Sequence, residues 1–183
     1  MKAFPDSARD IFANAYPETP ARLTHGLVDH PLLALPALVE LAASLPDKDV
    51  EYNPGKLPIG IAPEDIPSPR LGIVETIRSI EENGSWMVLK LVEQHPAYRE
   101  LLESALAELK PLVTPKTGEM LTLQGFIFIS SPDAVTPFHF DPEHNILLQI
   151  RGEKTMTVFP ATDEDIVSPL AHEGFHLGQH HRN

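Results

Sequence analysis

The hydrophobic pattern of the chain changes from helical to extended near Leu121, and this change limits the folds open to it. Before that point, apolar residues recur at helical spacing in several segments separated by prolines. After it, residues 121–131 are rich in β-branched and aromatic side chains, and residues 154–159 alternate as a strand does. Helices followed by a run of strands predict an antiparallel sheet or barrel behind a helical flank.

Three helices and one early strand are expected in the first part of the chain. One helix runs from about residue 32 to residue 45 with Pro36 near its start, and one begins near Ile73 and ends before Gly84. A third, residues 95–110, has Pro96 in its first turn. Residues 85–92 form a short apolar run that favours a strand, whereas residues 54–70 are proline-rich and predict an irregular loop.

The later part of the chain is predicted to be β. Residues 145–150 and 154–159 are two short apolar or alternating runs, and "RGE" between them (residues 151–153) is a compact turn, so the pair predicts a hairpin. We therefore expect one structural unit made of a helical and irregular region, residues 1–110, and a β portion, residues 111–183. The expected fold class is mainly β with N-terminal helices.

Composition excludes several classes of partner. The chain has 26 acidic and 14 basic residues among its 183, a net charge of −12. Nucleic acids and anionic membranes both require clustered Lys and Arg, so neither is expected as a partner. No apolar run approaches the roughly 20 residues that cross a bilayer. The N-terminus lacks a signal-peptide core, which predicts a cytoplasmic protein, and the absence of cysteine excludes disulfides and thiolate chemistry.

The segment "VTPFHFDPEHNILLQIRGEKTMTVFP", residues 135–160, holds the candidate functional residues. His139 and Asp141 are two residues apart, so on an extended strand both side chains leave the same face. One imidazole and one carboxylate suit a divalent first-row metal and supply two of the three ligands of an iron(II) facial triad. Taken alone the spacing is common, and a histidine hydrogen-bonded to a neighbouring aspartate is the simpler alternative.

The surrounding residues make the pattern more specific. Thr136 precedes the histidine by three residues, Asn145 follows the aspartate by four, and Lys154 lies nine residues further on. This window resembles the core signature of JmjC oxygenases of the cupin superfamily, which use Fe(II) and 2-oxoglutarate. Its motif is most similar to those of the asparaginyl hydroxylase that acts on hypoxia-inducible factor and of bacterial cupin-like JmjC proteins. The resemblance implies a double-stranded β-helix, the jelly-roll of cupins.

The resemblance also implies a role for each residue. His139 and Asp141 would bind the iron and carry the catalysis. Lys154 would pair with the distal carboxylate of the cosubstrate 2-oxoglutarate, Thr136 would donate to that carboxylate, and Asn145 would lie beside the metal. A dicarboxylate in an apolar barrel does need a buried cation, because an unpaired buried carboxylate is very costly. For Lys154, a simpler alternative is a hairpin-edge lysine that keeps the edge soluble.

Two rival functions are open. "HEGFH", His172 to His176, fits the H-E-x-x-H pattern of zinc peptidases. That chemistry needs a stable helix and a further downstream ligand, whereas here Gly174 interrupts the motif and the sequence ends soon after it. The other rival is a cupin-like protein that binds a metal or small ligand without catalysis, because one fold supports many functions.

The third iron ligand is the main departure from the resembled family, which takes a second histidine from a late strand. We expect none of His172, His176, His180 and His181 to be a rigid iron ligand, and we expect all four on a surface segment. We also expect the barrel to be incomplete, and dioxygenase activity only if the 183 residues are part of a longer polypeptide. The substrate is expected to be a protein side chain or a small molecule, and assembly as a homodimer stays open.

Overall fold

The structure is a computed structural model that describes residues 2–54, 71–136, 138–141, 143–160 and 162–177. Short 3-10 turns cover Pro31–Leu33, Asp47–Asp49 and Val92–Gln94. The helices and strands, in chain order, are α1 (Asp6–Ala15), α2 (Leu35–Ser44), β1 (Val50–Pro54), α3 (Ile73–Arg78), β2 (Ser85–Leu89), α4 (Pro96–Ala107), α5 (Lys110–Thr117), β3 (Ile127–Ser130) and α6 (Pro169–His176).

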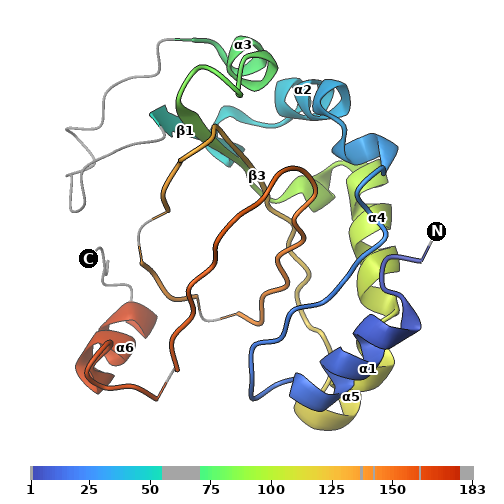
Figure 1. The fold of residues 1–183 in the computed structure, drawn as a ribbon, viewed down its shortest axis with the longest axis vertical. Coiled ribbons are helices and arrows are strands. Elements are labelled where there is room, and N and C mark those ends of the chain that lie inside the picture. The colour runs from blue at the N-terminus through green and yellow to red at the C-terminus, as the bar shows by residue number, and fades with distance from the viewer. Residues whose placement is uncertain (1, 55–70, 137, 142, 161, 178–183) are drawn as a thin grey trace.

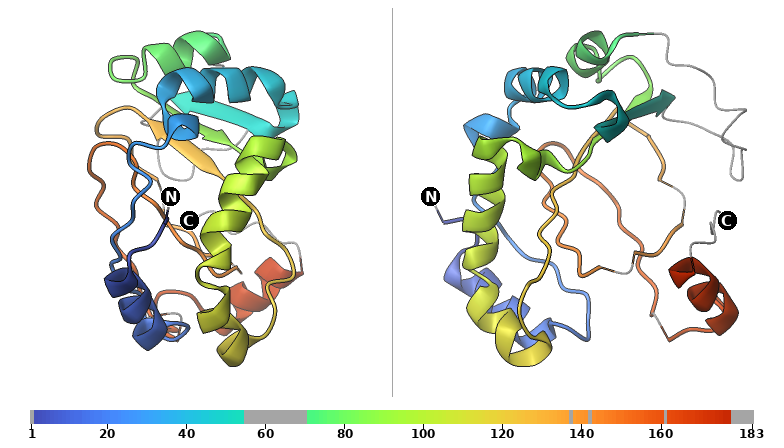
Figure 2. Two further views of the ribbon diagram at one scale, coloured as in Figure 1. Left: turned by 90° about the vertical axis from the view of Figure 1, so that its right-hand side faces the viewer. Right: turned by 180° about the vertical axis from the view of Figure 1, so that it is seen from behind.

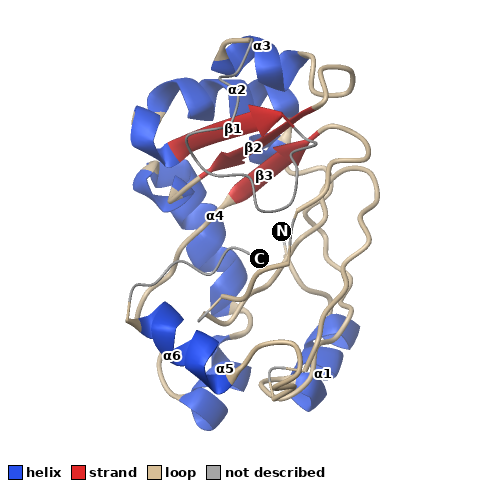
Figure 3. Ribbon diagram, turned by 90° about the vertical axis from the view of Figure 1, so that its left-hand side faces the viewer, coloured by secondary structure: helices blue, strands red, loops and turns tan. Residues whose placement is uncertain are grey.

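The three strands form one antiparallel sheet in the order β1-β2-β3. Leu89 of β2 lies opposite Val50 on one side and opposite Ile127 on the other. Residues directly opposite each other on neighbouring strands lie on the same face of a sheet, so these three residues share one face. Helices α2 and α3 cover that face (Figure 3). On the opposite face Trp86 and Phe128 are in ring contact at 6.0 Å, and Phe128 remains 46% exposed.

Helix α4 joins two separate hydrophobic clusters. Tyr98 near its start belongs to the cluster under α2, α3 and the sheet. Ala105 near its end, together with Leu109 just beyond it, belongs to a second cluster with α1 and α5, where Phe4 and Phe12 are buried. Figure 1 shows α4 running from the sheet down to α1 and α5, and both views of Figure 2 show the same course. The chain after β3 leaves the sheet and leads to α6 (Figure 1).

Several predicted elements are present. The helix expected at residues 32–45 forms as a 3-10 turn followed by α2, and proline lies in its first turn as predicted. α4 begins at Pro96, and β2 begins at Ser85. The helix that begins at Ile73 ends at Arg78, earlier than expected, and Gly84 instead adopts a φ of 65° just before β2. The expected loop at 54–70 lies almost entirely outside the described residues.

The predicted fold class is wrong. A mainly β jelly-roll is not what the described residues form, since helices predominate and the sheet has three short strands. Residues 144–150 and 153–160 form no strand, so the predicted hairpin is wrong as well, although Gly152 at its turn has a positive φ of 69°. Alternation gives a segment the period of a strand, but a strand also needs a hydrogen-bonding neighbour. The division of the chain at residue 110 stays a prediction.

Within the described part of the chain, no helix combines the length and apolar character that crossing a bilayer requires.

Tyr98 fixes α4 against the turn before α2. Its hydroxyl donates to the carbonyl oxygen of Leu32 at 2.7 Å, and the side chain is buried. Burial, followed by the nearby negative charge of Glu40, raises the pKa of Tyr98 from 10.0 to about 12. Both causes disfavour the phenolate in the folded state.

Stability should therefore fall in alkaline solution because of Tyr98. The folded-state pKa lies above the unfolded value, so the contribution is complete below pH 10 and is lost between pH 10 and about 12. The effect is on the order of a few kcal/mol at most. In urea titrations at pH 8 to 12, Tyr98→Phe should lower stability by about 1 kcal/mol at pH 8, and its deficit should shrink and then reverse as the pH rises. A constant deficit across this range would contradict the assignment.

Candidate metal-binding site

A turn after β3 directs the chain to the candidate site. The Ser131 hydroxyl donates to the Ile80 carbonyl and accepts from the Ser85 amide at 2.9 Å, while the Ser131 amide donates to the Ser85 carbonyl at 2.9 Å. The Ala134 amide donates back to the Ser131 carbonyl, and Asp133 takes a positive φ of 61°. These bonds tie the start of the segment to the end of the sheet.

The structure brings together three of the predicted residues. His139 Nε2 lies 3.9 Å from Asp141 Oδ2, and the Asn145 side-chain amide donates to the same Asp141 oxygen at 2.7 Å. The His139 and Asp141 side chains are 55% and 46% exposed, so a metal ion from solvent can reach both. Asn145 orients the carboxylate, because a hydrogen bond to one oxygen limits its rotation.

The pair fits two positions of a metal site. Ligand atoms at about 2.1 Å from a metal lie roughly 3.0 Å apart when they are adjacent at 90°, and no more than about 4.2 Å apart in any geometry. The observed 3.9 Å lies inside that limit, and a small rotation of the carboxylate would close it to the adjacent position. Within the described residues, no group of three potential His, Cys, Asp or Glu ligands is gathered.

Thr136 and Lys154 lie on exposed stretches of the same segment. In the part of the chain that the structure describes, neither forms a hydrogen bond or an ion pair with the His139–Asp141 pair. The Phe138 and Phe159 rings are in edge-to-face contact, with centroids 5.7 Å apart. The residues after Lys154 therefore lie beside the residues around His139. The neighbouring cation Arg151 already pairs with Glu81 at 3.3 Å.

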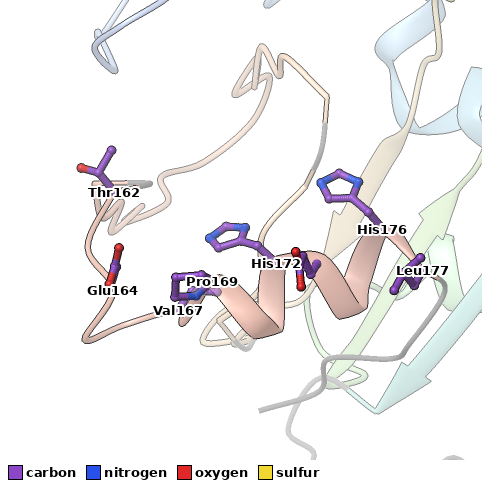
Figure 4. Close-up of a pocket in the computed structure, with 8 residues that line it drawn as sticks. Thr162, Glu164, Val167, Pro169, His172, His176 and Leu177 are labelled. Atoms are coloured by element: carbon purple, nitrogen blue, oxygen red, sulfur yellow. The ribbon is translucent and has the colours of Figure 1, made fainter.

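The H-E-x-x-H motif lies on a helix, although its glycine predicted otherwise. α6 begins at Pro169, and the Ser168 side chain caps it by accepting from the Ala171 amide. His172 and His176 are one turn apart, and Figure 4 shows both rings leaving the same side of the helix. His176 is exposed, whereas His172 is half-buried and no described residue hydrogen-bonds to its buried Nε2 atom. His180 and His181 lie outside the described residues.

A cleft of about 710 Å³ lies between α6 and the preceding loop (Figure 4). It is lined by Thr162, Glu164, Val167, Pro169, His172, Glu173, His176 and Leu177. None of the five predicted site residues is among them. The cleft therefore does not include the His139–Asp141 pair. The assignment of the pair as a candidate metal site rests on the geometry of the two side chains.

Two rings of α6 contact Phe140, the residue between the two candidate ligands. The sequence did not predict this contact. Phe140 lies 4.8 Å from the His172 ring and 4.8 Å from the Phe175 ring, measured between centroids. No local pattern in the sequence links Phe140 to His172 or Phe175, because each lies more than 30 residues further along the chain. The contact places the Phe140 ring against α6, while the side chains of its two neighbours approach each other.

Comparison with known proteins identifies the family. The family model for the cupin-like domain matches residues 77–181, which is more than half of the 183 residues and includes every candidate site residue. No curated protein and no solved structure shows a significant match. On the family match, this chain belongs to the cupin-like domain family.

Proposed function

We propose that this protein is an Fe(II)- and 2-oxoglutarate-dependent oxygenase of the JmjC type, with a hydroxylase reaction at a C–H bond. The observation that carries the proposal is the convergence of His139 Nε2 and Asp141 Oδ2 at 3.9 Å in a cupin-like chain. An imidazole and a carboxylate are ligands that non-haem iron(II) uses. Bound iron with its cosubstrate would supply the oxidising chemistry.

Each residue of the chain has a defined task in this proposal. His139 and Asp141 bind the metal, and Asn145 holds the Asp141 carboxylate through its 2.7 Å hydrogen bond. A residue that orients a ligand in this way commonly changes metal affinity by 10- to 100-fold, as an order of magnitude. Lys154 and Thr136 would bind the distal carboxylate of 2-oxoglutarate, Lys154 through its charge and Thr136 through its hydroxyl.

Metal binding should depend on both members of the pair. Titration calorimetry with Mn(II), a redox-stable substitute for Fe(II), should show binding to the parent that is weakened at least tenfold in His139→Ala and in Asp141→Ala. Because only two protein ligands are gathered among the described residues, affinity of the parent itself should be modest and turnover of 2-oxoglutarate slow.

His144→Ala is the matched control, since it removes an exposed imidazole from the same segment that instead contacts Tyr16. This variant should titrate like the parent. Equal affinity in the parent, His139→Ala and Asp141→Ala would place the metal elsewhere and overturn the proposal.

The exposed positions of Thr136 and Lys154 favour a second candidate, a cupin-like protein that binds a metal or small ligand without oxygenase activity. Thermal-shift measurements with Mn(II) and 2-oxoglutarate, against a panel of other small acids, separate the two. For an oxygenase, 2-oxoglutarate should raise the melting temperature, because a ligand that prefers the native state stabilises it. Lys154→Ala should remove that rise, and Arg151→Ala, already paired with Glu81, should not. A rise with other acids alone supports the second candidate.

A further inference from the structure

We propose that helix α6 positions the candidate metal ligands through ring contacts with Phe140. His172 and Phe175 of α6 then act as positioning residues for the His139–Asp141 pair. This inference rests on the proposed metal site. It concerns a helix that the proposed function does not use, and it assigns His172 to packing rather than to metal coordination.

The first step is the placement of Phe140 between the two ligands. In an extended segment, the central side chain leaves the face opposite its two neighbours. The contacts in the structure agree with this arrangement. His139 and Asp141 converge at 3.9 Å, while the Phe140 ring contacts α6. Fixing that ring therefore limits rotation of the backbone that carries both ligands.

The second step is the way α6 holds the ring. His172 and Phe175 are three residues apart, so they lie on one face of the helix. Their ring centroids are each 4.8 Å from that of Phe140, at interplanar angles of 45° and 57°. Ring pairs at this separation contribute about 0.5–1.5 kcal/mol beyond area burial. Figure 1 shows α6 apart from α1, α4 and α5. Contacts between α6 and the segment that carries Phe140 therefore contribute much to the placement of α6.

The third step concerns His172 itself. Its Nε2 atom is buried without a hydrogen-bond partner among the described residues, which costs free energy. A metal ion cannot reach that atom without displacing the ring. The ring contact with Phe140 is an interaction that the structure does give this side chain. A phenyl ring should therefore replace the imidazole without loss of metal affinity.

Metal affinity of a set of variants of the full chain tests the inference. Phe175→Leu should weaken Mn(II) binding about fivefold, with the melting temperature of the main fold unchanged, because α6 lies outside both core clusters. His172→Phe should bind Mn(II) like the parent. Leu170→Ala, which removes an exposed side chain from the same helix, is the matched control and should change affinity less than twofold.

A double-mutant cycle and a metal-free measurement separate positioning from general damage. In a His139→Ala background, Phe175→Leu should have no further effect on Mn(II) affinity, because the residue acts through the ligand pair. In NMR spectra without metal, Phe175→Leu should shift the His139 ring resonances, whereas Leu170→Ala should not.

The possible failures are distinguishable. Unshifted His139 resonances in Phe175→Leu would overturn the inference whether or not the parent binds Mn(II). Loss of Mn(II) binding in His172→Phe would overturn it too, by making His172 a ligand. A parent that binds no Mn(II), but whose His139 resonances respond to Phe175→Leu, would support the positioning role and contradict the proposed function.

Discussion

Replacing Glu108 with alanine should lower the free energy of unfolding by about 2–4 kcal/mol, because it leaves two backbone amides without an acceptor. One carboxylate oxygen accepts from the Ala3 amide at 2.7 Å, and the other accepts from the Phe4 amide at 3.0 Å. Ala3 and Phe4 are 3% and 1% exposed, so both amides belong to buried residues, where a donor without an acceptor is costly. The carboxylate anchors the N-terminal segment to the end of α4.

Two variants control this experiment. Glu103→Ala removes an exposed carboxylate from the same helix and should change stability by less than about 0.5 kcal/mol. Glu108→Gln keeps one acceptor oxygen and should recover part of the loss. Urea denaturation followed by circular dichroism measures all three. An unchanged denaturation midpoint in Glu108→Ala would show that the N-terminal segment does not depend on this contact.

Replacing Gly125 with alanine should cost about 1–3 kcal/mol through overpacking. An added methyl carbon would lie 2.8 Å from Val92 Cγ2 and 3.7 Å from Leu102 Cδ2. Val92 is buried and stiff at χ1, so it has little room to move. The backbone of Gly125 is also fixed, since its amide donates to Glu93 at 2.9 Å and its carbonyl accepts from the Val92 amide at 2.9 Å.

Gly72→Ala is the matched control for this change. Among the described residues, nothing lies within 4 Å of a methyl group added at Gly72, and its φ of −70° suits any residue. This variant should change stability by less than about 0.5 kcal/mol, because the lower conformational entropy of alanine in the unfolded chain offsets its weaker preference for the N-cap of α3. Thermal unfolding compares the two. Equal melting temperatures for Gly125→Ala and Gly72→Ala would contradict the close approach of the 3-10 turn to residue 125.

Local signals predicted the elements that depend on local interactions. Pro96 begins α4 as expected because proline suits the first turn of a helix, and the apolar spacing of residues 35–44 forms α2. The His139–Asp141 convergence could be predicted for the same reason. Two residues on alternate positions of an extended segment share a face whatever the rest of the fold does. Asn145, which the family resemblance implied beside the metal, hydrogen-bonds to Asp141.

Pairing between distant segments could not be predicted in this way. β1, Val50–Pro54, was not expected, yet it pairs with β2 opposite β3 and makes β2 the central strand of the sheet. Residues 144–150 and 153–160 have the period of strands but no ladder, so the expected hairpin does not form. The contact of Phe140 with Phe175 and the approach of Gly125 to Val92 likewise join positions far apart in the chain.

The sequence by itself therefore determined α2, α3 and α4, the strand periods, the family and the candidate ligand pair, whereas α1, α5 and α6 were not predicted. These depend on side chains within a few residues of one another, or on a motif read in one stretch. Only the tertiary structure decided which strands pair, where Gly125 permits close approach and how α6 contacts Phe140. Those outcomes depend on which distant apolar surfaces bury one another, and periodicity carries no information about the partner.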